Sequence, residues 1–194
     1  MYKRKKTRIS SLLINGLLVT FFLLFLTGIS FSADETPQIL ITSIGQSPDA
    51  RMINVLISRY QIETAYEQLA TPEIVKDYKI VIAVVGGSSK GLGAAGIDKE
   101  QELSRSKALI KEVKELEVSL LVMHIGGEAR RGALSDAFLD VVIPYADHLI
   151  IVESGNMDGY FNKMSEEHKI PLQSVEKIVD CGELVKEYIE KNLD

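Results

Sequence analysis

The sequence predicts an α/β fold, a three-layer sandwich with a parallel, flavodoxin-like or Rossmann-like sheet. Two observations carry this prediction. Short runs rich in Val and Ile lack polar alternation, which is typical of strands that are buried on both faces. Amphipathic helical patterns separate these runs, and strands that alternate with helices form a sheet with right-handed crossovers. Four runs fit the strand pattern: residues 39–41, 79–85, 118–124 and 148–152.

Helical patterns fill most of the intervals between these runs. In the longest pattern, Asp98 can cap a helix whose apolar positions recur at three- and four-residue spacing as far as Leu116. The other predicted helices span residues 49–59, follow Ser135, follow Gly159, and span residues 182–193.

Two weaker strands complete the predicted sheet. Residues 61–66 alternate like an edge strand, and residues 174–178 form a candidate final strand. We expect the order 2-1-3-4-5 for the first five strands, as in flavodoxin-like sheets. Residues 33–194 are predicted to form a single α/β domain.

The N-terminal segment differs from the rest of the chain. Residues 1–33 carry five basic residues and no acidic residue, and an apolar run covers residues 12–26. Ser30 and Ser32 provide the small residues of a cleavage site, so residues 1–32 are predicted to be a signal peptide. The alternative is an uncleaved N-terminal anchor, because the apolar stretch is long enough to cross a bilayer. Either way we expect an exported protein that is periplasmic, extracellular or attached to the cell envelope.

The charge of the remaining chain limits its partners. The whole chain has a net charge of -5, and the 161 residues after residue 33 hold 17 basic and 27 acidic residues, a net charge of -10. A domain this acidic does not attract phosphate backbones broadly, so we expect no nucleic-acid partner. We expect membrane contact only through an uncleaved N-terminal segment.

Cys181 is the single cysteine and is predicted to be a small buried residue. The oligomeric state is left open.

Glycine-rich, polar loops follow the four predicted central strands. The carboxyl ends of parallel strands share one edge of the sheet, where open α/β folds bind ligands. We therefore expect a ligand-binding site at this edge. Its candidate residues are Ser43, Gln46, Ser47, Gly86, Gly87, Ser88, Ser89, Lys90, Gly91, His124, Gly126, Gly127, Glu128, Arg130, Arg131, Glu153, Asn156 and Asp158.

The loop sequences carry a family resemblance. The runs GGSSKGLGAAGID at 86–98 and HIGGEARRGALSD at 124–136, together with residues 45–49 and 153–158, resemble a family of exported bacterial proteins classed as a domain of unknown function. The resemblance covers almost the whole chain after the N-terminal segment. It implies a small exported α/β domain and supplies no activity.

The preferred interpretation of these loops is a binding site for a small anionic or polar ligand. Glycines let consecutive backbone N–H groups point inward, and Lys90, Arg130 and Arg131 add positive charge. Arginine suits carboxylate or phosphate because its donors are planar. The structural alternative is that Arg130 and Arg131 pair with nearby carboxylates and hold the loops.

An enzyme is the second interpretation. Residues 87–91 fit the G-x-S-x-G spacing of a nucleophile elbow, with Ser89 as the serine, although we expect the following glycines to delay the helix. His124 is the candidate acid or base, and its loop position is expected to keep it reachable. The chain would then be a hydrolase or transferase that uses Ser89, His124 or both.

Other site types fit the sequence less well. Residues 91–96 match the G-x-G-x-x-G string of dinucleotide folds, but five residues separate them from the strand end at Val85. A metal site could draw on His124 and neighbouring carboxylates, yet their spacing matches no metal motif. We expect no cofactor and no metal. A cell-envelope interaction protein without catalysis is the third interpretation.

Overall fold

The computed structural model describes residues 36–193, and the predicted signal peptide or anchor, residues 1–32, lies outside this part. The chain from Pro37 onward forms one compact unit. No helix among the described residues is long and apolar enough to cross a membrane.

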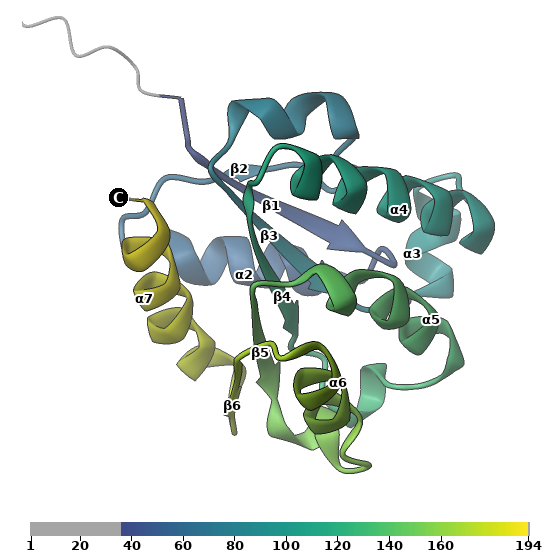
Figure 1. Ribbon diagram of the computed structural model, residues 1–194. Coiled ribbons are helices and arrows are strands. Elements are labelled where there is room, and N and C mark those ends of the chain that lie inside the picture. The colour runs from purple at the N-terminus through teal and green to yellow at the C-terminus, as the bar shows by residue number, and fades with distance from the viewer. Residues whose placement is uncertain (1–35, 194) are drawn as a thin grey trace, which may run out of the picture. The chain divides into compact units, whose positions relative to one another are not determined.

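A parallel sheet of six strands forms the centre of the domain (Figure 1). The strands lie in the order β2-β1-β3-β4-β5-β6, and every adjacent pair is parallel. The predicted α/β class and the predicted order of the first five strands are therefore confirmed. The strands are β1 (Ile39–Ile44), β2 (Ala65–Tyr66), β3 (Ile80–Val85), β4 (Ser119–His124), β5 (His148–Val152) and β6 (Leu172–Val175).

Helices cover both faces of the sheet (Figure 1). One face packs against α2 (Asp49–Ser58) and α7 (Cys181–Leu193). The other face is covered by α3 (Ser89–Ala94), α4 (Lys99–Glu115), α5 (Ala133–Val142) and α6 (Tyr160–His168). Short 3-10 helices lie in the connections: η1 (Pro72–Asp77), η2 (Glu128–Arg130), η3 (Ile143–Tyr145), η4 (Glu153–Asn156) and η5 (Ile178–Asp180).

The innermost strands are buried on both faces, as their composition predicts. β1 and β3 pair from Ile39 with Ile80 to Ile44 with Val85, and all residues of both strands are buried. β1 continues beyond the predicted end at residue 41, because its polar residues Thr42 and Ser43 are fully buried within the strand.

The sequence places the edge strands less well. β2 has only two residues instead of the six predicted over 61–66, and β6 begins at Leu172 rather than at residue 174. Edge strands bury less apolar surface, so their sequences carry a weaker pattern. α3 was not predicted, because its glycines argue against a helix. The Ser88 side chain caps it by accepting a hydrogen bond from the Gly91 N–H at 3.0 Å.

Cys181 is buried at the start of α7, as predicted. Burial, helped by the negative charge of Asp180, raises the pKa of its thiol to about 11. The thiol is therefore protonated and unreactive at neutral pH.

A buried ion pair fixes α4 beneath the loop that follows β1. Glu102 is fully buried, and its carboxylate accepts hydrogen bonds from the Gly45 N–H at 2.8 Å and the Gln46 side chain at 2.9 Å. Arg105 binds both carboxylate oxygens, at 2.7 and 2.8 Å, and donates to the Ser43 carbonyl at 2.6 Å. The opposite charges of Glu102 and Arg105 balance each other, and the hydrogen bonds of the pair hold the end of β1 in place.

The substitution Arg105→Met tests the importance of this pair. It leaves the Glu102 carboxylate buried without its counter-charge, so we expect the free energy of unfolding to fall by about 3–5 kcal/mol. The matched control Lys111→Met, in the same helix, breaks an exposed 3.4 Å pair with Glu115. It should cost less than about 1 kcal/mol. Urea denaturation measures both losses, and equal losses would contradict the structural role of Arg105.

Candidate functional site

The loops after β1 and β3 are joined at the carboxyl edge of the sheet. The Ser47 N–H donates to the Gly86 carbonyl at 3.1 Å, and the Ser88 N–H donates to the Gly45 carbonyl at 2.8 Å. Gly45 has φ +88°, and a side chain there would meet the Gly86 oxygen at 2.6 Å. Only glycine allows this approach, and the two hydrogen bonds join the loops along their backbones.

The candidate residues of the first loop face the interior. Ser43, Gln46 and Ser47 are all buried. The Ser43 hydroxyl donates to the Ser47 carbonyl at 3.2 Å. The Gln46 side chain donates to Glu102 and accepts a 3.0 Å hydrogen bond from the Gln68 side chain. The hydrogen bonds of these three residues hold the loop from its buried side.

The second loop places its candidate residues at the start of α3. Ser88 is the N-cap, Ser89 and Lys90 are exposed in the first turn, and Gly91 lies within the helix. The helix begins at once after the cap, so the expected delay by the glycines is wrong. Gly91 and Gly93 lie inside α3 rather than at the tight turn that a dinucleotide fingerprint requires.

His124 is fully buried at the end of β4, so the expectation that its loop position keeps it reachable is wrong. Its Nδ1 lies 2.9 Å from the Val85 carbonyl, its Nε2 lies 3.4 Å from the Gly127 carbonyl, and Phe161 packs beside the ring. The shorter contact assigns the proton of the neutral ring to Nδ1. Burial lowers the pKa of His124 below 6.5, and the two carbonyl contacts oppose this shift only in part.

This position separates His124 from Ser89. Both ring nitrogens of His124 face backbone carbonyls, and His148 bonds Gln173 at 2.7 Å. In the described part of the chain, Ser89 makes no hydrogen bond to a histidine. The arrangement lacks the serine–histidine contact that activates a nucleophile.

Arg130, in the third loop, lies beside the buried carboxylate of Asp49 in α2. Its Nε is 3.9 Å from Asp49 Oδ1, and its side chain is 33% exposed, whereas Asp49 is buried at the first position of α2. Gly126 lies between the two, and a side chain there would collide with Arg130 and come within 2.9 Å of Asp49 Oδ2. Gly127 continues the turn with φ +58°, and Glu128 is exposed at the start of η2.

Arg131 is held by the structure on all sides. It lies 2.9 Å from Asp136 and 3.0 Å from Asp158, and its guanidinium stacks 4.5 Å from the Tyr160 ring. Its hydrogen bond is the main cause that lowers the pKa of Asp158. Arg131 therefore has the structural role expected as the alternative to ligand binding: its charge is balanced by Asp136 and Asp158, and it holds the loops together.

The fourth loop supports this arrangement. Asn156 accepts a hydrogen bond from the Phe161 N–H at 2.8 Å near the start of α6, and Asp158 binds Arg131. Glu153 is exposed and accepts a 3.4 Å hydrogen bond from Ser174. These candidate residues fix the loop between β5 and α6.

A small cavity lies where the second and third loops meet α5. Its volume is about 230 Å³. The Gly87 N–H donates to the Ser135 hydroxyl at 2.8 Å, which sets the first turn of α5 against the second loop. Within residues 36–193, no side chain caps this end of α5, where Gly132 is the N-cap. The lining residues are Gly87, Ala129, Arg130, Arg131, Gly132, Ala133, Leu134 and Ser135, and Lys90 is not among them.

Two residues of this region escaped the sequence-based list. Asp49 reads as an ordinary first residue of a helix, yet its Oδ2 is buried and has no hydrogen-bond partner among the described residues. Ser135 reads as a helix start, although α5 begins two residues earlier and Ser135 binds the second loop. Their spacing in the sequence gives no sign of either contact.

The described residues offer no cluster for a metal ion. Within them, no group of three or more His, Cys, Asp or Glu side chains is placed to hold one. The carboxylates of Asp49, Asp136 and Asp158 instead lie beside arginines, Asp49 beside Arg130 and the other two beside Arg131.

The fold and the cavity define a class, a doubly wound α/β domain with a small polar hollow at the carboxyl edge of its sheet. Within this class, the chain belongs to the family described as Domain of unknown function (DUF6305), which matches residues 36–189. The predicted membership of a family of unknown function is thereby confirmed. No curated protein matches the chain.

Solved structures show only distant similarity. The psychrotrophic esterase EstA from Pseudoalteromonas sp., in a structure inhibited by monoethylphosphonate, is 10% identical, with 81% of this chain and 97% of that chain covered and a TM-score of 0.32. AlinE4, an SGNH-hydrolase family esterase, is 13% identical, with coverages of 82% and 94% and a TM-score of 0.33. Similarity at this level carries no argument about the chemistry of this chain.

The buried His124 predicts a pH dependence of stability. Because the folded-state pKa lies below 6.5, the unfolded chain binds the proton first, and the free energy of unfolding falls as the pH drops below about 6.5. One proton limits this slope to about 1.4 kcal/mol per pH unit. The substitution His124→Asn keeps a hydrogen-bond donor near the Val85 carbonyl and removes the titrating group. Urea denaturation between about pH 5 and 7, where histidine titrates, should therefore show a smaller change of the free energy of unfolding with pH in this variant.

The control for this prediction is His168→Asn, which changes a partly exposed histidine at the end of α6. It should retain the slope of the unmodified protein. An unchanged slope in His124→Asn would show that His124 does not cause the pH dependence.

Proposed function

We propose that this domain binds a small anion in the cavity at the start of α5. The observation that carries the proposal is the meeting of an uncapped helix N-terminus with the Arg130 side chain around one hollow. Helix N-termini favour anions because their N–H groups and dipole point toward the ligand. Arginine adds a planar pair of donors that matches carboxylate and phosphate oxygens.

Arg130 is the cation that a ligand would engage. Its contact with Asp49 is long, at 3.9 Å, and the side chain is partly open to solvent. Asp49 lies in the first turn of α2, where the helix dipole stabilises its charge independently of Arg130. Arg131 forms a wall of the cavity, but its charge is matched by Asp136 and Asp158.

The size of the cavity limits the ligand. A volume of about 230 Å³ is smaller than the roughly 300–1,000 Å³ of sites that enclose drug-sized molecules. The hollow suits a phosphate, sulfate or carboxylate group, and any larger part of the ligand would extend into solvent. Ser89 lies outside the lining and makes no hydrogen bond to a histidine among the described residues, so we favour binding over hydrolysis.

We propose further that the domain acts outside the cytoplasm. The support is the basic start, the apolar run and the small residues of residues 1–32. Expression of the full chain in a bacterial host, followed by N-terminal sequencing of the exported protein, should give a chain that begins at Ala33. Retention of the whole chain in the membrane fraction would support the uncleaved anchor, and an intact chain in the cytoplasm would contradict export.

Isothermal titration with inorganic phosphate, sulfate and acetate tests the binding proposal. We expect at least one of these anions to bind the unmodified protein. Arg130→Gln should weaken that binding at least about tenfold, since a charged hydrogen bond contributes about 1.5–3 kcal/mol. The matched control Arg59→Gln removes an exposed arginine at the end of α2, outside the cavity, and should bind as before. Absence of binding by all three anions, or equal binding by Arg130→Gln, would refute the proposal.

A further inference from the structure

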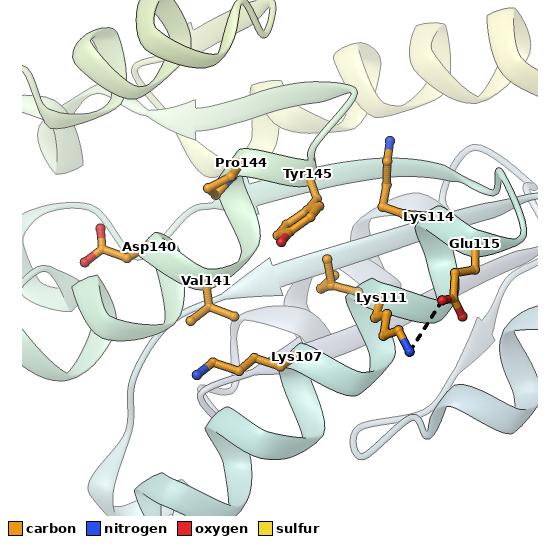
Figure 2. Close-up of a pocket in the computed structure, with 9 residues that line it drawn as sticks. Lys107, Lys111, Lys114, Glu115, Asp140, Val141, Pro144 and Tyr145 are labelled. Carbon is orange, nitrogen blue, oxygen red and sulfur yellow. Dashed lines mark ion pairs between the residues drawn. The ribbon is translucent and has the colours of Figure 1, made fainter.

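A second hollow lies between α4 on one side and the end of α5 with η3 on the other (Figure 2). Its volume is about 590 Å³, within the roughly 300–1,000 Å³ typical of small-molecule sites. It shares no lining residue with the cavity at the carboxyl edge. It is therefore a separate place on the molecule.

The floor of this hollow is apolar. Ile110 of α4 is buried beneath it, and Val141 and Pro144 form the opposite side. The Tyr145 ring is directed toward α4 and is 48% exposed (Figure 2). A ligand with an apolar body would remove this ring and its neighbours from water, which favours binding.

Lysines form the rim along α4. Lys107, Lys111 and Lys114 recur at spacings of four and three residues, which places them on one face of the helix. Like charges at this spacing repel one another. Lys111 and Lys114 have acidic partners at 3.4 Å, whereas Lys107 makes no ion pair with any residue that the structure describes.

Two acidic side chains, Glu115 and Asp140, also line the hollow. Glu115 is the partner of Lys111, as the dashed line in Figure 2 marks. Asp140 accepts a 2.7 Å hydrogen bond from the Tyr160 hydroxyl of α6. The lining thus holds three lysines and two carboxylates, a formal excess of one positive charge beside an apolar floor. Lys107 is the lysine of this rim that has no ion-pair partner among the described residues.

We propose that this hollow binds a small amphipathic anion, an aromatic or aliphatic body that carries one sulfonate, sulfate or carboxylate group. The body packs on Tyr145 and Val141, and the anionic group lies near Lys107 and Lys111. Apolar surface supplies most of the affinity, and the lysines select the charge.

Fluorescence titration of the full chain with 8-anilinonaphthalene-1-sulfonate tests this site. The double variant Lys107→Gln/Lys111→Gln should weaken binding of this dye about threefold to tenfold, because each exposed charge contact contributes up to about 1 kcal/mol. It should leave binding of the neutral dye N-phenyl-1-naphthylamine unchanged. Tyr145→Ser should weaken binding of both dyes. Every variant carries the same N-terminal segment, so the comparison isolates the hollow.

The control uses another apolar groove, of about 460 Å³, between α2 and η5, where Arg51 and Arg59 lie beside exposed Met52. Arg51→Gln/Arg59→Gln makes the same change in charge and should leave the dye affinity unchanged. Equal weakening by the arginine variant, or no effect of the lysine variant, would overturn the proposal. Added phosphate should not displace the dye; displacement by phosphate that Arg130→Gln abolishes would place the dye in the first cavity and also overturn it.

Discussion

The bidentate pair between Glu102 and Arg105 is the interaction on which the carboxyl edge of the sheet depends. A buried carboxylate needs hydrogen-bond partners, and both oxygens of Glu102 find them, in Arg105, the Gly45 N–H and the Gln46 side chain. The same contacts fix the turn in which Gly45 approaches Gly86. A charge in α4 thus determines the shape of a loop that follows β1, more than fifty residues earlier in the chain.

The sequence predicts those parts of the fold whose pattern follows from burial. Val- and Ile-rich runs identify the inner strands because both of their faces lie against helices. The short edge strand β2 has no such pattern and was predicted too long. α3 escaped prediction because one contact, from Ser88 to Gly91, offsets the poor helix propensity of its glycines.

The location of the candidate site follows from topology, but the roles of its residues do not. Arg130 and Arg131 are neighbours of the same type, yet only Arg131 meets Asp158, which lies 27 residues further along the chain. His124 ends a strand, as predicted, but Phe161 and two carbonyls enclose it. Such differences arise from packing between distant segments, which local sequence does not encode.

The strand order has a consequence for how the chain reaches this structure. From β3 to β6 the order in space equals the order in the sequence, so each new strand docks on the one made just before it. Each step closes one helix-containing crossover between strands that are successive in the sequence. The chain separation to be closed is therefore smaller than in a sheet whose neighbouring strands are far apart in the sequence. β1 pairs with β3 on one edge, so it joins the sheet once β3 has formed, and β2 pairs with its other edge. A chain that emerges with its N-terminus first can therefore fold progressively, one strand and helix at a time.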